Sequence, residues 1–431
     1  MRIKYLVPVI LGLLLVTTNA YAAEQILTVS EKLDFLFIAV SAILVFIMQA
    51  GFALLESGMV RSKNAINVMM KNYVDLCAVM LVFWFFGYGL MWGSDHNGWI
   101  GFNDFFKTDF ASPELMNLIF QLMFAATAAT IVSGALAERI NFGSYILISI
   151  LMSAFLYPVI GGWIWNPNGW LSQLGFHDFA GATVVHSTGG WCALAALLIL
   201  GPRLGRFSQD GSRRPIHGHN LTLVALSGFI LWFGWFGFNM GSSGTVSGEL
   251  PRVLFNTIIG GASGGIAGVL LMLLTRSPVL LTHTVVASIS GLVAITAGAD
   301  VMGIGFAALT GAVGGIVCIL GIELLESLRV DDAVGAVACH AFAGSWGTIA
   351  AGMFIDGDLF NMPQTMIQII GAAACFGWAF FGGLLVFGGV NAIIKLRVSS
   401  TTERRGLDYV EHYEIGYPEF QGRLTNPGKV S

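Results

Sequence analysis

The sequence predicts an all-α integral membrane protein with eleven transmembrane helices, and three observations lead to this fold class. The 431 residues are 55% hydrophobic and only 11% charged, whereas soluble domains carry about 25% charged residues. The apolar residues form runs of roughly 20, the length that crosses the hydrocarbon core of a bilayer. Cations gather in alternate connections between those runs, as expected for a multi-span protein.

The composition also excludes several function classes. A mean hydropathy of +0.76 leaves too few polar residues to cover a soluble enzyme or to form a disordered regulator. Lysine and arginine number 21 against 25 acidic residues, a net charge of -4, so no polycationic surface for nucleic acid is expected. The five cysteines are odd in number and lie in apolar stretches, which predicts neither a disulfide framework nor a cysteine metal site.

Residues 1–22 have the features of a cleaved signal peptide. Arg2 and Lys4 form a positive start, an apolar core follows from Leu6 to Val16, and Ala20-Tyr21-Ala22 is a small-x-small cleavage site. The alternative is an uncleaved extra helix. Cleavage would place the mature N-terminus outside.

Eleven apolar spans follow within residues 23–395, and their short connections predict one membrane domain. The expected spans are 33–55, 72–92, 115–136, 142–164, 179–201, 219–241, 252–275, 279–297, 301–324, 333–354 and 366–394. Residues 396–431 are polar and charged and are predicted to form a cytoplasmic tail.

Charged residues divide between the two sides as the positive-inside rule expects. The predicted inner connections and tail hold Arg61, Lys63, Arg139, Arg203, Arg206, Arg213, Arg214, Arg276, Arg329, Lys395, Arg397, Arg404 and Arg405. The predicted outer side holds only the cations Lys32, Lys107 and Arg252, beside a larger number of acidic residues. This asymmetry favours an odd number of spans, with the N-terminus outside and the C-terminus inside.

Two segments share a spacing that indicates an internal repeat. Residues 178–186 and 332–340 both read D-x-x-G-A-x-x-x-H, at the fifth and tenth spans. A weaker pair of segments, 51–58 and 237–244, closes the first and sixth spans. Spans one to five therefore resemble spans six to ten, and because five is odd the second half crosses the membrane in the opposite sense. Such an inverted 5+5 repeat, here followed by one further helix, is typical of transporters whose pathway lies between the halves.

The repeat places His186 and His340 near the middle of the membrane. Each lies about 12 Å along a helix, and the two helices begin on opposite sides of a core ~30 Å thick. The pair could handle protons or line a pore, ligate a metal or haem, or be a buried packing pair. Residue chemistry alone leaves these three interpretations open.

Asp178 and Asp332 stand where these two helices begin. A carboxylate at that position caps the free backbone N–H groups of a helix N-terminus, which is the simplest interpretation of both residues. Asp178 also lies toward the outer face, where it could favour an arriving cation.

Several motifs in the right order resemble the ammonium transporter family (Amt/Mep/Rh), in particular its bacterial Amt branch. They extend from about residue 30 to about residue 418 and include 178–186, Phe238-Asn-Met-Gly-Ser242, Asp331-Asp332…His340, Gly134-Ala-Leu-Ala-Glu138-Arg139 and Gly406-Leu-Asp408…Glu411-His412. The resemblance implies a homotrimer in which each eleven-helix subunit has its own pore. It also implies that the tail, 396–431, is regulatory and docks under the neighbouring subunit.

The resemblance also implies a role for each pore residue. The outer recruitment site for the ammonium ion would consist of Phe120, Phe124, Trp165 and Ser242. Phe124 and Phe238 would stack as a gate, His186, His340 and Trp235 would line the pore, and Asp178 would support the recruitment site. The residue types suit these roles because aromatic faces attract cations and a serine hydroxyl accepts a hydrogen bond. The alternatives are helix packing for the phenylalanines and a membrane-interface position for Trp165.

We therefore expect a multi-pass ammonium transporter of the inner (plasma) membrane, not an enzyme, with no cofactor or metal. It would recruit NH4+ outside, deprotonate it near the gate and conduct NH3, with or without the proton, past the histidines. The alternatives are an ammonium-sensing transceptor with little flux and, in another class, a bis-histidine metal or haem oxidoreductase. The expected partners are the lipid membrane, two further subunits and a PII-type signalling protein. The arginines at 203, 206, 213 and 214 would offer that signalling protein a cationic inner loop.

Overall fold

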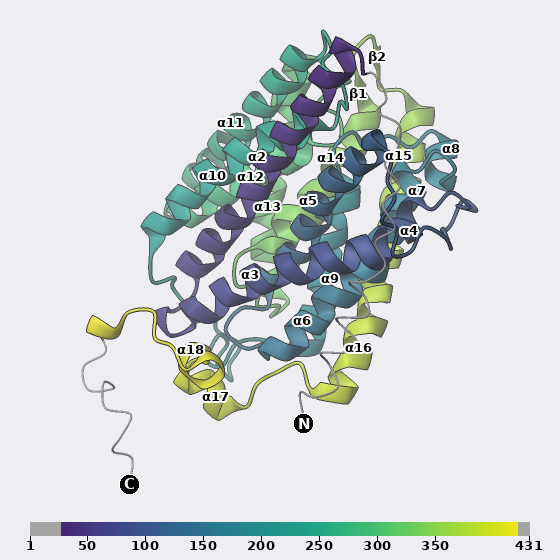
Figure 1. Ribbon diagram of the computed structural model, residues 1–431. Coiled ribbons are helices and arrows are strands. Elements are labelled where there is room, and N and C mark those ends of the chain that lie inside the picture. The colour runs from purple at the N-terminus through teal and green to yellow at the C-terminus, as the bar shows by residue number, and fades with distance from the viewer. Residues whose placement is uncertain (1–26, 421–431) are drawn as a thin grey trace, which may run out of the picture.

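The computed structural model describes residues 27–420, which form a bundle of eleven membrane-crossing helical segments (Figure 1). Nine of these segments are long and apolar, and the two shorter ones are α12 (Leu281–Ile295) and the segment that ends in α14 (Ala343–Met353). The predicted number of spans is confirmed. The predicted signal peptide, 1–22, lies outside the described residues.

The first half of the bundle runs from α2 to α9. Its helices are α2 (Val29–Met59), α3 (Ala65–Val82), α4 (Tyr88–Trp92), α5 (Ser112–Ala135), α6 (Phe142–Leu151), α7 (Tyr157–Trp165), α8 (Trp170–Leu174) and α9 (Thr188–Leu200). Short π-helical turns join α3 to α4 and α6 to α7, so that each pair forms one span. α2 begins before the predicted residue 33 because Thr28 and Glu31 form a capping box at its N-terminus.

The second half of the bundle runs from α10 to α14, and the eleventh span and the tail follow. The further helices of this half are α10 (Leu221–Gly241), α11 (Leu250–Leu274) and α13 (Ile304–Ser327). The eleventh span consists of α15 (Met362–Phe376) and α16 (Gly382–Ile394), and the tail contains α17 (Ser400–Arg405) and α18 (Leu407–His412). A π-helical turn joins α15 and α16 into one span. A small antiparallel hairpin, β1 (Phe354–Ile355) with β2 (Asp358–Leu359), follows α14.

The two ends of the bundle correspond to the two predicted sides of the membrane. α2 begins at the end of the bundle where the β1–β2 hairpin lies, and α17 and α18 lie at the opposite end (Figure 1). The predicted inner connections meet the tail at that end: Lys63 Nζ donates to the Glu403 carbonyl at 2.8 Å, and the Leu204 N–H donates to Glu403 Oε1 at 2.6 Å. The first and last spans therefore begin and end on opposite sides, as an odd number of spans requires.

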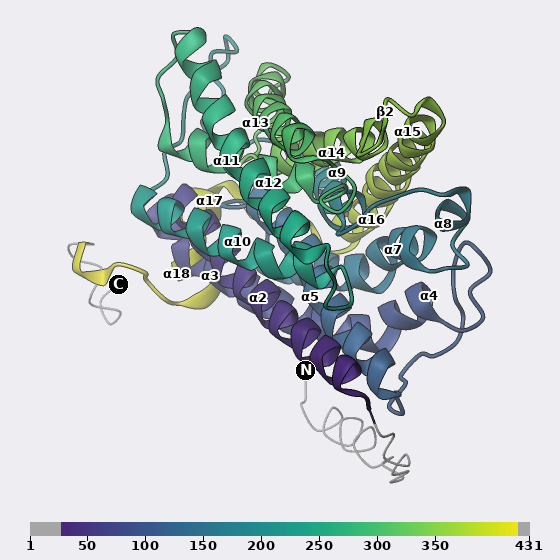
Figure 2. The ribbon, with the colours of Figure 1, turned by 90° about the horizontal axis from the view of Figure 1, so that it is seen from above.

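α2 and α10, the first spans of the two halves, pack side by side (Figure 2). Two glycines on α10 make this approach possible. A Cβ at Gly234 would lie 2.1 Å from Met48 Cγ, and one at Gly237 would lie 2.5 Å from Leu44 Cβ. Close glycine contacts of this kind are a usual means of helix packing in membranes, and here they bring the two repeats together.

The shared D-x-x-G spacing builds the same helix start twice. The Asp178 carboxylate accepts hydrogen bonds at 2.8–3.0 Å from the backbone N–H groups of Gly181, Thr183 and Val184. The Asp332 carboxylate accepts equivalent bonds at 2.7–3.3 Å from Val334, Gly335 and Val337. Gly181 and Gly335 have φ angles of +104° and +77°, which glycine adopts most readily. The predicted capping by both aspartates is confirmed.

The described part of the tail docks on the inner face of its own chain. Asp408 accepts hydrogen bonds from the N–H groups of Ile66 and Asn67 at 3.0 and 2.8 Å, so it caps the start of α3. The Leu407 N–H donates to Asn64 Oδ1 at 2.9 Å. These contacts lie within one chain, and the docking under a neighbouring subunit that the resemblance implied stays a prediction.

Candidate functional site

The two predicted histidines meet in the interior of the bundle. His186 lies in the π-helical turn Ala182–Ser187 before α9, and His340 lies in the matching turn Val337–Phe342 before α14. Their Nδ1 atoms are 3.2 Å apart, and the rings lie nearly parallel with centroids 5.2 Å apart. The side chains are almost completely buried, and His186 Nε2 has no hydrogen-bond partner among the described residues. A buried polar atom without a partner is available to a small polar molecule.

An aromatic column continues from His186. Trp235 and Phe238, both on α10, stack against His186 with centroids 5.1 and 5.3 Å away. Phe238 stacks in turn on Phe124 of α5 at 4.2 Å. Phe124 and Phe238 are 1% and 0% exposed, so this stacked pair closes the column to solvent. The predicted gate residues, Phe124 and Phe238, therefore lie next to the predicted pore residues His186 and Trp235.

The column ends in residues that solvent can reach. Phe120 and Trp165 lie 4.6 and 5.7 Å from Phe124, measured between ring centroids. The Ser242 hydroxyl donates to the Phe238 carbonyl at 2.9 Å and keeps its oxygen lone pairs free to accept. Trp165 and Ser242 are partly exposed. The structure thus brings the predicted recruitment, gate and pore residues into one continuous column.

Asp178 lies beside the column rather than in it. Its carboxylate is occupied by the three backbone N–H groups that it caps, and its carbonyl oxygen accepts the Trp165 Nε1–H at 2.8 Å. Asp178 therefore fixes both the start of the histidine-bearing turn and the orientation of Trp165. This placement agrees with a supporting role.

Sequence reasoning missed three residues that contact the column or its inner end. Thr296 accepts the Nε1–H of Trp235 at 2.9 Å, and the Phe52 ring lies 6.0 Å from His340. Glu56, on α2, is 1% exposed and lines a cavity with His340. An acidic residue within an apolar span is a recognisable signal, but hydropathy averaging over a whole span hides a single charge.

Two neighbouring cavities lie between His340 and the tail end of the bundle. A cavity of about 20 Å³ adjoins His340, Phe52 and Glu56. A larger inner vestibule of about 260 Å³ is lined by Arg206, His283 and Asp332, among others, and shares Val286 and Val334 with the small cavity. The aromatic column and these two cavities therefore lie on opposite sides of the histidine pair.

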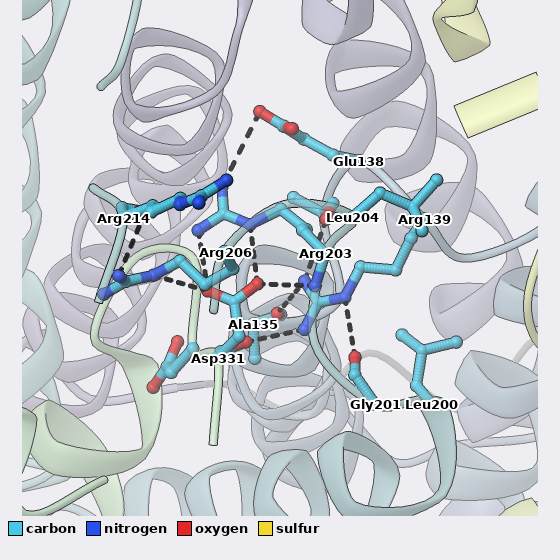
Figure 3. Close-up of polar contacts among 12 residues, drawn as sticks. Ala135, Glu138, Arg139, Leu200, Gly201, Arg203, Leu204, Arg206, Arg214 and Asp331 are labelled. Atoms are coloured by element: carbon cyan, nitrogen blue, oxygen red, sulfur yellow. Dashed lines mark hydrogen bonds and ion pairs between the residues drawn. The ribbon is translucent and has the colours of Figure 1, made fainter. Parts of the chain in front are cut away.

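Most arginines of the predicted cationic inner loop are paired with acidic residues, and the use of this loop as a docking surface stays a prediction. Arg203 donates to both oxygens of Asp331 at 2.8 Å, and Arg206 lies 3.4 Å from Asp331 (Figure 3). Arg206 also donates to Glu326. Arg213 pairs with Glu323 at 2.6 Å. Burial acts to raise the pKa of Asp331, but the hydrogen bonds and charge of Arg203 hold that pKa well below its usual range. These arginines stabilise the inner loops and offer little free positive charge.

The fold and the column by themselves define a class of protein. They describe a multi-span transporter with an inverted repeat, whose pathway passes an aromatic constriction and a histidine pair between the two halves. The chain belongs to the ammonium transporter family: the model of the Ammonium Transporter Family matches residues 36–417.

Individual relatives agree with this assignment. The chain is 40% identical to ammonium transporter Amt2 of Archaeoglobus fulgidus, with 96% of this chain and 95% of the relative covered. It is 38% identical to Amt2 of Methanocaldococcus jannaschii, with 93% and 96% covered. Among solved structures, one described as "Sensor Amt Protein" has a TM-score of 0.86 at 38% identity, with 89% and 99% covered. Mep2 of Candida albicans has a TM-score of 0.79 at 28% identity, with 86% and 87% covered.

The protein is therefore a multi-pass ammonium transporter of the plasma membrane and not an enzyme. The alternative of a bis-histidine metal or haem oxidoreductase is overturned by this family membership. The predicted family, fold class and transport function are confirmed.

Proposed function

We propose that the outer end of the column recruits NH4+ and that the ion loses a proton at the gate. Trp165, Phe120 and Phe124 offer aromatic faces to the cation, and the Ser242 oxygen accepts one of its N–H groups. The observation that carries this proposal is the unbroken column from Trp165 to His340, closed by the stacked Phe124 and Phe238 rings. A bare ion in so dry a path would lose its hydration without an equivalent replacement.

Ammonia then passes the histidines, with or without the proton. NH3 is neutral and costs far less to dehydrate than the ion. The unpartnered His186 Nε2 offers it a hydrogen bond at the most buried point of the column. The contact between the two Nδ1 atoms at 3.2 Å also provides a polar link along which a proton could pass between the rings. Reprotonation on the inner side completes the transport.

Growth tests this proposal in cells. The chain should restore growth on limiting ammonium to a host without ammonium transporters of its own, at an acidic external pH that suppresses passive NH3 permeation. The same host carrying an empty vector should grow poorly. Equal growth of the two strains would contradict the transport proposal.

The recruitment site predicts a specific loss of apparent affinity. Trp165→Leu and Ser242→Ala should each raise the ammonium concentration for half-maximal uptake severalfold. A cation–π contact is worth about 0.5–1 kcal/mol when exposed and ~2 kcal/mol when desolvated. Trp170→Leu is a matched control, because Trp170 stacks on Trp99 at 5.4 Å, away from the column. An unchanged concentration dependence in both test variants would contradict the outer site.

Sensing is a second candidate function. One solved structure of high similarity, at 38% identity, is described as a sensor. A sensor would bind ammonium in the outer column and carry little flux. Ammonium-dependent thermal stabilisation of the purified protein, without ammonium accumulation in proteoliposomes, would favour this second function.

We further propose that three copies assemble and that each keeps its own pore. An apolar stripe on one face of α2 supports subunit or lipid contact. It consists of the exposed residues Leu33, Leu36, Val40, Ile43 and Ile47. The inner face would also bind a PII-type signalling protein, but the paired inner arginines make a docking surface based on their charge less favourable.

The tail, 396–431, would then regulate transport through its contact with α3. Truncation after residue 396 should lower ammonium flux without abolishing assembly, because it removes the Asp408 cap on α3 and the contacts of Glu403. Flux in proteoliposomes and the elution volume in size-exclusion chromatography measure the two effects. Truncation after residue 420 is the control, since it keeps both contacts. Full flux after the longer deletion would show that the tail has no regulatory role.

A further inference from the structure

Glu56 is a buried acid that the transport steps described so far do not use. It lies near the inner end of α2, and its Oε2 accepts hydrogen bonds from Asn72 Nδ2 at 3.0 Å and Ser133 Oγ at 2.8 Å. Thr130 donates to the Asn72 side-chain oxygen at 2.6 Å, which orients the Asn72 NH2 group toward Glu56. A buried acid within a membrane span is costly, and such residues usually serve a function.

The surroundings of Glu56 leave one of its oxygens free. Lys71 Nζ donates to the Ser133 carbonyl at 2.9 Å, so a buried ammonium group lies close to the carboxylate without a direct bond to it. Among the described residues no hydrogen bond reaches Glu56 Oε1. This arrangement holds the Glu56 carboxyl group in a fixed orientation and leaves its Oε1 free to accept a hydrogen bond.

The cavity on the inner side of the histidine pair brings Glu56 and His340 to the same space. Glu56 and His340 line the same space of about 20 Å³, which holds about one water-sized molecule. The rest of the lining is almost entirely apolar, with Phe52, Ile131 and Val286 among its residues. Gly134 maintains this space, because a Cβ there would lie 3.1 Å from Glu56 Cγ and 2.6 Å from Val334 Cγ2.

We propose that Glu56 forms a second ammonium-binding site, on the inner side of the histidine pair, where ammonia becomes ammonium again. NH3 that has passed His340 takes a proton from a hydronium ion of the inner vestibule, so that NH3 and H3O+ give NH4+ and H2O. Glu56 Oε1 accepts an N–H of the new ion, and the carboxylate charge stabilises it. NH4+ then leaves past Val286 and Val334 into the vestibule. This inference rests on the proposed function.

Flux through proteoliposomes tests the site. Glu56→Gln keeps the shape of the side chain and removes its charge. Maximal ammonium flux should fall roughly tenfold or more, because a charge-assisted hydrogen bond is about twice as strong as a neutral one and the charge also offsets that of the ion. The concentration for half-maximal flux should change by less than about twofold, because the outer site is intact. Wild-type maximal flux in Glu56→Gln would overturn the proposal.

Two further variants make the result specific. Asp75→Asn is the matched control: Asp75 is also buried in a span, accepts the Tyr145 hydroxyl and does not line the cavity. Its flux should stay near that of the wild type, and an equal loss in both variants would overturn the site. If Glu56→Gln does not assemble, the flux of Gly134→Ala tests the proposal instead, because this substitution narrows the cavity and keeps the carboxylate. Wild-type flux in Gly134→Ala would overturn the proposal. A wild-type protein without any flux would instead contradict the proposed function.

Discussion

His186→Ala and His340→Ala should each lower ammonium flux roughly tenfold or more, or admit potassium, while the protein still assembles. The two rings are the polar groups at the most buried part of the column. Removing one takes away a hydrogen-bond partner of the passing ammonia, at a cost of about 1–3 kcal/mol, and about 1.4 kcal/mol is a factor of ten in rate. An alanine would also widen the path. Ammonium and potassium fluxes in proteoliposomes measure both effects.

His283→Ala is the matched control for these variants. His283 also lies in a span but lines the inner vestibule, away from the histidine pair. Its flux and its selectivity should stay close to those of the wild type. If both pair variants carried ammonium at the wild-type rate and still excluded potassium, the pore role of the histidines would be wrong.

Asp178→Ala should abolish transport and lower the free energy of unfolding by about 3 kcal/mol or more. The substitution leaves three buried N–H groups without an acceptor, each worth about 1–3 kcal/mol. The turn that carries His186 would lose its cap, and the residue 178 carbonyl that accepts the Trp165 Nε1–H would be held less firmly. The midpoint of thermal unfolding in detergent, together with flux, measures the effect.

Asp178→Asn distinguishes two roles of Asp178: support of the helix start by capping, and direct electrostatic attraction of NH4+ by the carboxylate. The amide keeps an acceptor oxygen, so it should recover part of the lost stability and, with it, part of the transport. A variant as stable as the wild type but without transport would show that the carboxylate charge acts on the substrate. That outcome would contradict the supporting role assigned to Asp178.

The sequence contains most of the fold because membrane spans are long local signals. Each span needs about 20 apolar residues, and the positive-inside asymmetry orients the whole series. Each copy of the D-x-x-G-A-x-x-x-H motif is also a short local signal. The two copies predicted the capping aspartates and the approach of His186 to His340. The column residues followed from the family resemblance, and the structure places them together.

Long-range pairing is what the sequence could not show. Arg203 and Asp331 are far apart in the chain, so the loop that holds Arg203 looked like free positive charge until the fold brought the two together. The docking of Asp408 on α3 depends on a similar distant contact. Glu56 was missed because a hydropathy average over α2 conceals one acid, and its cavity exists only once α2, α5 and the His340 turn are packed together.

The most direct test of the central claim is ammonium accumulation in proteoliposomes that contain the purified wild-type chain. An inward gradient of ammonium, compared with an equal gradient of potassium, should give saturable accumulation of ammonium and none of potassium. Protein-free vesicles measure the passive permeation of NH3. Ammonium accumulation no faster than in those vesicles, or equal accumulation of potassium, would contradict a selective ammonium pathway through the aromatic and histidine column.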